Sequence, residues 1–155
     1  MPRQSIAALA AGLALVALPA VSQPVTVTDG DTIKLDGTTY RLHGIDAPEA
    51  KQWCGDYPAG AIASGALAKL VEGADRVTCE AKATDRYGRT VAICRADGRD
   101  SGQAMVRLGM AWAFVRYSGD YVAAQDAASA DNLGIHRHGC TPAWDWRASR
   151  RPASR

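Results

Sequence analysis

The sequence predicts a single α+β domain, a small closed β-barrel with helices packed against it. Two observations support this fold class. Several short segments rich in β-branched residues are separated by tight-turn signals, and helical patterns interrupt and follow these segments. Short strands in a row with helices inserted late are typical of α+β domains.

Two hairpins account for the predicted strands. Apolar and polar residues alternate through residues 24–35, and the Asp36-Gly37 pair that follows is a strong hairpin signal, because a two-residue turn needs positive φ. The return strand is expected to run from residue 38 to about residue 45. The second hairpin is expected to join residues 76–81 and 89–96 through a turn at residues 85–88.

Helical periodicity predicts three helices. The first has Ile62, Ala66 and Leu70 at four-residue spacing. Each helix is followed within two residues by a glycine, which readily adopts the left-handed conformation that ends helices. The three helices are expected to cover residues 58–71, 101–108 and 120–133.

The first 22 residues have the features of a signal peptide. A basic start at Arg3 precedes an apolar run over residues 6–20 that is too short to span a bilayer as a mature helix. Small residues favour cleavage after Ser22, with cleavage two residues earlier as an alternative. The apolar run could alternatively be an uncleaved membrane anchor or a core helix, but it lacks helix caps. We expect a secreted or periplasmic protein of 133 residues, which suffices for one domain and leaves no membrane association after cleavage.

The charge balance excludes a protein that binds nucleic acid mainly through a large positive net charge. The whole chain carries a formal charge of +2 at pH 7, and without the signal peptide 17 basic residues face 16 acidic ones, a net charge of +1. Non-specific electrostatic binding grows with the number of cations that contact phosphates. Any phosphate chemistry must therefore depend on local placement of arginine and lysine.

Four cysteines lie in the exported part, an even number that suggests disulfides in an oxidising compartment. Three pairings are possible. A hairpin over the 85–88 turn would set Cys79 and Cys94 nearly opposite each other, so we favour Cys79–Cys94 together with Cys54–Cys140. A Cys/His metal cluster is the competing idea, and no C-x-x-C spacing supports it.

Three carboxylates are expected to converge near the end of the first hairpin. With the turn centred on the Asp-Gly pair, Asp31 lies across from about residue 43, and Asp46 is then on the order of 10 Å away. Side chains and the connecting loop would bring both to one hard cation such as Ca²⁺, and a proline turn offers Glu49 from the same loop. Each aspartate taken alone is equally well a turn residue.

Two arginines indicate that these acids belong to a catalytic site and not only to a calcium site. Arg41 alternates with Leu42 on the return strand, and Arg89 follows directly on the turn of the second hairpin. A planar guanidinium binds phosphate oxygens in pairs and stabilises charge that develops at phosphorus. Either arginine alone would be an ordinary surface residue. Beside a metal, the two predict phosphodiester hydrolysis.

Four motifs occur in a specific order: DGDTIKL (29–35), RLHGIDAPE (41–49), DRYGR (85–89) and MVRLGMAWA (105–113). In that order they resemble the motifs of the staphylococcal-nuclease (thermonuclease) family, and the closing PAWDWR (142–147) resembles the ending of bacterial members. The resemblance covers about residues 25–147. It implies a five-stranded OB-fold β-barrel with three packed helices, in a domain spanning residues 23–147. The tail at residues 148–155 is rich in arginine and contains a proline, and we expect it to be disordered.

The resemblance also implies calcium-dependent cleavage of DNA and RNA to 3′-phosphate products. The metal ligands would be Asp31, Asp46 and the backbone carbonyl of Ala47, where a founding member has threonine. The catalytic residues would be Glu49, as general base toward water, with Arg41 and Arg89 stabilising the transition state. The expected partners are DNA and RNA substrates, bound by a monomer.

Substrate contacts are expected from Arg86, Tyr87 and Tyr117, which match the family's phosphate and nucleotide-binding positions. A further family tyrosine corresponds to Val115 here, so part of the base-stacking surface is absent. Trp112 is expected in the core. The alternative function is a non-catalytic OB-fold module that binds nucleic acid, and a disulfide-stapled calcium-binding module would explain the aspartates but not the arginines.

Overall fold

A computed structural model describes residues 24–151 of the chain. The predicted signal peptide, residues 1–22, lies outside the described residues. Among the described residues no helix is both long and apolar enough to span a membrane.

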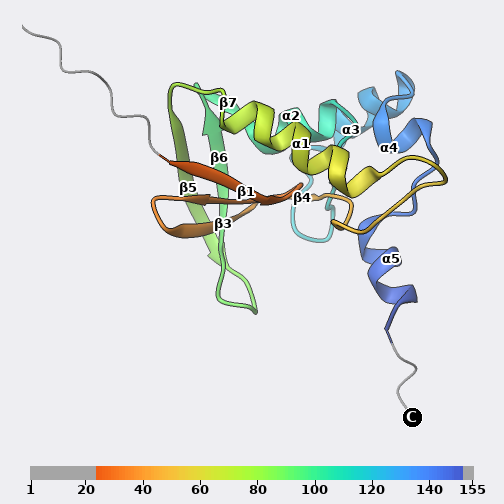
Figure 1. Cartoon of the computed structure of the whole chain (residues 1–155), viewed down its shortest axis with the longest axis horizontal. Coiled ribbons are helices and arrows are strands. Elements are labelled where there is room, and N and C mark those ends of the chain that lie inside the picture. Colours follow the sequence, from red (N-terminus) through yellow and green to blue (C-terminus); the bar gives the residue numbers. More distant parts are fainter. Residues whose placement is uncertain (1–23, 152–155) are drawn as a thin grey trace, which may run out of the picture.

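Five main strands form one strongly bent sheet in the order β1-β2-β3-β6-β5, with β3 and β6 parallel and the other neighbours antiparallel (Figure 1). A short strand β7 (Arg99–Asp100) adds to β6, and β4 (Ile45–Asp46) pairs with β8 (Trp112–Ala113) in a separate two-stranded sheet. The main strands are β1 (Val25–Asp29), β2 (Thr32–Leu35), β3 (Thr38–Leu42), β5 (Val77–Thr84) and β6 (Thr90–Ala96).

The sheet has the five strands and packed helices that were expected, but hydrogen bonding does not close it. In the part of the chain described, the end strands β1 and β5 do not pair with each other. Helix α1 (Ala59–Val71) packs against β1 instead, which covers this edge.

The predicted single strand over residues 24–35 is wrong, because the chain turns back within it. Strands β1 and β2 form a hairpin whose turn contains Gly30 and Asp31, and the Asp29 carboxylate accepts a hydrogen bond from the Asp31 backbone N–H at 3.1 Å. The alternation of apolar residues runs in phase through this turn and conceals it. A Cβ atom on Gly30 would lie 2.7 Å from that of Ala47 and 2.8 Å from that of Ala63, so only glycine lets the turn pack this closely.

The predicted turn at Asp36-Gly37 is present as expected. Asp36 and Gly37 both have positive φ, 49° and 80°, the combination that a tight hairpin turn requires. The strands β2 and β3 on either side pair so that Thr32 lies opposite Arg41. The predicted return strand to residue 45 ends earlier, at Leu42, and the chain resumes strand pairing only in β4.

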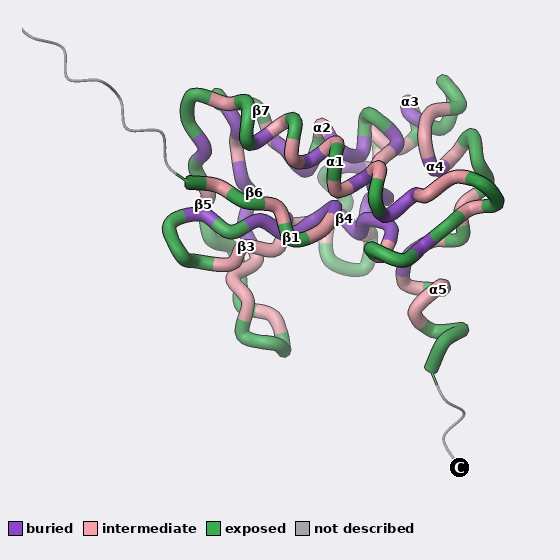
Figure 2. The backbone as a smooth tube through the Cα atoms, in the orientation of Figure 1, coloured by how far each residue is buried: buried purple, intermediate pink, exposed green. Residues whose placement is uncertain are grey.

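Three of the five helices fall within the predicted ranges. They are α1, α2 (Ser101–Arg107) and α3 (Val122–Ala130). The Asp100 carboxylate caps α2 by accepting a hydrogen bond from the Gln103 N–H at 3.0 Å. The α1 and α2 faces that turn toward the sheet carry the buried residues of the main core (Figure 2).

The three predicted helices are joined by two further short helices that were not predicted, α4 (Gly134–Arg137) and α5 (Ala143–Ser149). Because α5 runs to Ser149, the predicted disordered tail cannot begin at residue 148. Short helices form mainly through tertiary packing. Trp144 of α5 stacks on Phe114 at 5.3 Å between ring centroids and meets the buried Trp112 edge-on at 6.1 Å.

Both disulfides favoured from the sequence are formed in the structure. Cys79 and Cys94 lie directly opposite each other in β5 and β6 and are joined. The second disulfide joins Cys54, in the segment after β4, to Cys140, just before α5.

Replacing Cys79 and Cys94 together with alanine is expected to lower the free energy of unfolding by about 3 kcal/mol, because this disulfide closes a short loop and restricts the unfolded chain. Guanidinium denaturation without reductant measures the change. An unfolding midpoint equal to that of the parent protein would contradict this expectation.

Candidate active site

Two buried aspartates share one arginine at the end of the β2–β3 hairpin. Arg41 contacts Asp31 through Nη1 at 2.9 Å and Asp46 through Nη2 at 3.0 Å. The side chain of Asp46 is 0% exposed and that of Arg41 is 13% exposed. Both carboxylates therefore face the same small region, as the sequence predicted for Asp31 and Asp46.

Local structure holds Asp31 in this position. Its Oδ1 accepts a hydrogen bond from the Thr32 hydroxyl at 3.0 Å, and its Oδ2 accepts one from the Ala47 backbone N–H at 3.0 Å. The backbone carbonyl of Asp31 also accepts a hydrogen bond from the Leu42 N–H at 2.8 Å. Burial raises the pKa of Asp31 to about 7, and Arg41 opposes this rise only in part. The site therefore favours additional positive charge.

A second arginine, which sequence reasoning missed, reaches Asp46 from α5 and contacts Glu49 as well. Arg147 contacts Asp46 Oδ1 and Oδ2 at 3.1 and 2.7 Å, and its Nη1 contacts Glu49 Oε1 at 2.6 Å. The PAWDWR motif contained this residue, but no local signal connected it to an acid about 100 residues earlier.

The expected convergence of three carboxylates on one point is not found. No group of three or more acidic, histidine or cysteine side chains within residues 24–151 is placed to hold a metal. The reason is that a guanidinium lies between Asp46 and Glu49, so Glu49 faces Arg147. The proposed Cys/His alternative also fails, since Cys140 is in a disulfide.

The two aspartates with the backbone of Ala47 still form a donor set that suits a hard divalent cation. Carboxylate and carbonyl oxygens are the ligands that Ca²⁺ takes. The shared guanidinium of Arg41 demonstrates that one positive group can neutralise both carboxylates at once. The residues present therefore fit a calcium ion if Arg41 and Arg147 release some of their contacts with the two aspartates.

Arg89 lies in a separate contact group at the β5–β6 turn. Its Nε donates to Asp85 Oδ2 at 2.8 Å, while Asp85 Oδ1 accepts the backbone N–H groups of Tyr87 and Arg89 at 2.9 and 3.0 Å. The register pairs Arg41 with Val91, so Arg89, just before β6, precedes that position by two residues, about 7 Å along the strand direction. Asp85 is thus the residue that orients Arg89.

The predicted substrate-binding residues are accessible. Tyr87 and Tyr117 are 69% and 70% exposed, and Arg86 lies over the Tyr87 ring at 4.8 Å from its centroid. Val115, at the position of the missing tyrosine, is exposed as well. No contact with the aspartates is found for these side chains among the described residues.

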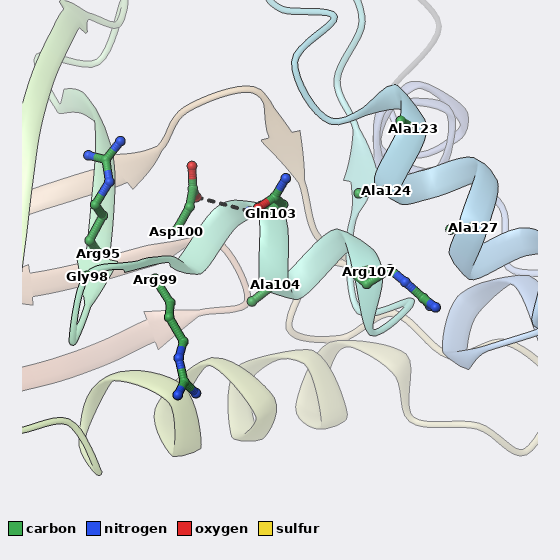
Figure 3. A pocket seen from close by; sticks show the side chains of 10 residues that line it. All are labelled: Arg95, Gly98, Arg99, Asp100, Gln103, Ala104, Arg107, Ala123, Ala124 and Ala127. Carbon is green, nitrogen blue, oxygen red and sulfur yellow. Dashed lines mark hydrogen bonds between the residues drawn. The ribbon is translucent and has the colours of Figure 1, made fainter.

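A wide surface pocket of about 750 Å³ lies elsewhere, between the end of β6, α2 and α3 (Figure 3). None of the predicted site residues lines it. Two of its arginines are already paired, Arg95 with Glu80 at 3.6 Å and Arg107 with Asp131 at 2.7 Å. The pocket therefore lacks the pair of buried carboxylates that defines the hairpin site.

Comparison with known proteins relates the chain to a family of nucleases. The model of the family described as staphylococcal nuclease homologue matches residues 39–137. The succinoglycan biosynthesis protein ExoI of Rhizobium meliloti (strain 1021) is 33% identical over 97% of this chain and 86% of its own length. An uncharacterized endonuclease of Escherichia coli O157:H7 is 37% identical over 79% of this chain and 82% of its own length. An uncharacterized endonuclease of Haemophilus influenzae is 34% identical over 72% of this chain and 63% of its own length.

Replacing Asp85 with asparagine is expected to lower the free energy of unfolding at pH 7 by about 1 kcal/mol, because a charged hydrogen-bond acceptor is lost. Partial burial acts to raise the pKa of Asp85, but hydrogen bonds from Arg89 and Tyr87 outweigh it and hold this pKa below its ordinary value. A lowered pKa stabilises the folded state above the unfolded-chain pKa, and this contribution is lost as the pH falls through the folded-state pKa.

The difference between the Asp85→Asn variant and the parent should therefore shrink below about pH 4. Urea unfolding over a pH series measures it. A difference that stays constant down to the acid limit would contradict the assigned contacts.

Proposed function

The chain belongs to the staphylococcal nuclease homologue family and is a nuclease, and we propose that it is a calcium-dependent endonuclease that hydrolyses phosphodiester bonds of DNA and RNA to 3′-phosphate products. One observation carries the proposal. Asp31 and Asp46 are buried and share the guanidinium of Arg41, which puts two carboxylates and one guanidinium in one place.

The calcium ion would be held by Asp31, Asp46 and the backbone carbonyl of Ala47. When bound, it supplies positive charge beside the scissile phosphate. The energetic argument is burial: two carboxylates in a poorly solvated site gain from a divalent cation, as the raised pKa of Asp31 indicates. The arginines then exchange carboxylate contacts for phosphate oxygens.

The chain's own residues provide the rest of the chemistry. Glu49 accepts a proton from water, the water oxygen bonds to phosphorus, and the bond from phosphorus to the 5′-oxygen breaks. The 5′-oxygen takes a proton from solvent as it leaves, and the phosphate stays on the 3′-oxygen. Arg41 and Arg89 bind the non-bridging oxygens and stabilise their growing charge. Asp85 holds Arg89 in a defined orientation for this purpose.

Exposed aromatic and basic side chains suit a single-stranded substrate next to the reacting phosphate. Tyr87 and Tyr117 offer stacking faces, and Arg86 offers a cation for a terminal phosphate. Valine at position 115 cannot stack in the same way, so base preference should differ from that of members with tyrosine there.

We also propose that the protein acts as a monomer in an oxidising compartment, either the periplasm or the medium. The support is the pair of disulfides, which persist in such compartments, together with the signal-peptide features of the sequence.

Mature protein incubated with plasmid DNA is expected to cut it in the presence of Ca²⁺ and to leave it intact in excess chelator. The variants Glu49→Gln and Arg89→Ala are expected to fold but to lose about 10²–10³ in rate, the usual cost of one such group. Arg76→Ala, which removes an exposed arginine from the other end of β5, is the matched control. Circular dichroism checks the fold.

Near-normal cleavage by either site variant would refute the assigned roles. Retention of DNA in a gel-shift assay without cleavage, with or without calcium, would favour the non-catalytic binding module.

Calcium is expected to stabilise the protein by about 2.7 kcal/mol at a concentration 100 times its dissociation constant, since it binds only the folded state. Asp46→Asn should lose most of this gain, because a buried ligand is removed. Asp126→Asn, an exposed aspartate on α3, should keep it. Thermal unfolding with and without calcium measures the effect, and an equal gain in all three proteins would place the ion elsewhere.

A further inference from the structure

The carboxylate of Glu49, the proposed general base, is held by a single side chain. Within residues 24–151 its hydrogen-bond and ion-pair partner is Arg147 alone, with Nη1 at 2.6 Å from Oε1. The Glu49 side chain is otherwise 37% exposed. An exposed glutamate without this contact would be free to rotate away from the site.

The same guanidinium nitrogen that holds Glu49 also contacts the proposed metal ligand. Nη1 lies 3.1 Å from Asp46 Oδ1, and Nη2 lies 2.7 Å from Asp46 Oδ2. The planar fork of arginine thus fixes one carboxylate relative to the other, which a single-point cation would not do. Partial burial acts to lower the pKa of Arg147, but hydrogen bonds to Asp46 and Glu49 outweigh it and raise this pKa. The group stays charged.

The segment that delivers Arg147 is fastened to the loop that carries Glu49. The disulfide Cys54–Cys140 joins the two, and Gln52 donates through Nε2 to the Thr141 carbonyl at 2.6 Å. The Oε1 atom of the same Gln52 accepts the backbone N–H of Glu49 at 3.2 Å. Figure 1 shows the chain between β4 and α1 passing beside the segment that leads into α5.

We propose that Arg147 is a positioning residue of the active site, which holds the Glu49 carboxylate beside Asp46 so that it can accept the proton of the attacking water. This inference rests on the proposed nuclease function. The inference concerns more than one contact, because it makes the disulfide-anchored helix α5 part of the active site.

Two other roles for Arg147 predict different behaviour. A purely structural ion pair between Arg147 and the buried Asp46 would contribute to stability and would not affect the rate of the chemical step selectively. An arginine that binds the substrate phosphate would mainly change KM, and its loss would add to the loss of Glu49.

The test compares Arg147→Met, which keeps the length but removes the fork and the charge, with Arg147→Lys. The control is Arg150→Met, directly after the same helix, because Arg150 lies over the Trp146 ring at 4.0 Å and has no contact with Asp46 or Glu49 in the described part of the chain. Cleavage of a single-stranded oligonucleotide gives kcat and KM, and isothermal titration with Ca²⁺ alone gives the metal affinity.

For Arg147→Met we expect kcat to fall about 10- to 100-fold with KM within about twofold, since general-base positioning acts on the chemical step. Lysine should recover part of kcat, and Arg150→Met should match the parent. Calcium should bind about threefold or more tightly to Arg147→Met, because Asp46 loses a competing positive charge. A variant whose site is misfolded would instead lose both its cleavage activity and its calcium binding.

The decisive comparison is made in the Glu49→Gln background under single-turnover conditions. If Arg147 acts through Glu49, Arg147→Met should cost less than about twofold further in that background. A full additional loss, or an unchanged kcat in the single variant, would overturn the inference. Absence of calcium-dependent cleavage in the parent protein would instead refute the proposed function itself, so the two failures are distinguishable.

Discussion

The carboxylate of Asp46 is completely buried, and the site is organised around this fact. A buried charge is tolerated only when it is paired and hydrogen-bonded, because its desolvation costs far more than an exposed ion pair returns. Here two guanidinium groups provide the compensation, Arg41 from the neighbouring strand β3 and Arg147 from the distant helix α5. Strand β3 and helix α5 therefore both contact one acid, and the same charge favours binding of a cation.

Several local features serve to keep these groups in place. Gly30 allows the β1–β2 turn to approach the chain after β4, which brings the Ala47 N–H onto Asp31. Asp85 orders the β5–β6 turn and with it Arg89. The disulfide Cys54–Cys140 and the buried Gln52 fasten the segment before α5 to the loop after β4. Each of these features restricts the positions that a charged side chain of the site can adopt, and preorganised electrostatic catalysis requires such restriction.

Features that depend on neighbours in sequence were predictable, and features that depend on distant contacts were not. The Asp36-Gly37 turn and the facing of Cys79 and Cys94 follow from turn chemistry and strand register. The β1–β2 break was hidden, because its turn preserves the alternation of apolar residues. Helix α5 has too few residues to show helical periodicity, and it forms where Trp144 packs on Phe114.

The sequence by itself determined the fold class, the family and the identity of the candidate groups, since these depend on residue types, local turns and the order of motifs along the chain. Only the tertiary structure decided which charges meet. It placed Arg147 against Asp46 and Glu49, about 100 residues away, and left Arg89 with Asp85. The physical reason is that ion pairs carry no sequence periodicity: any arginine can satisfy any aspartate, and the packing of the backbone selects among them.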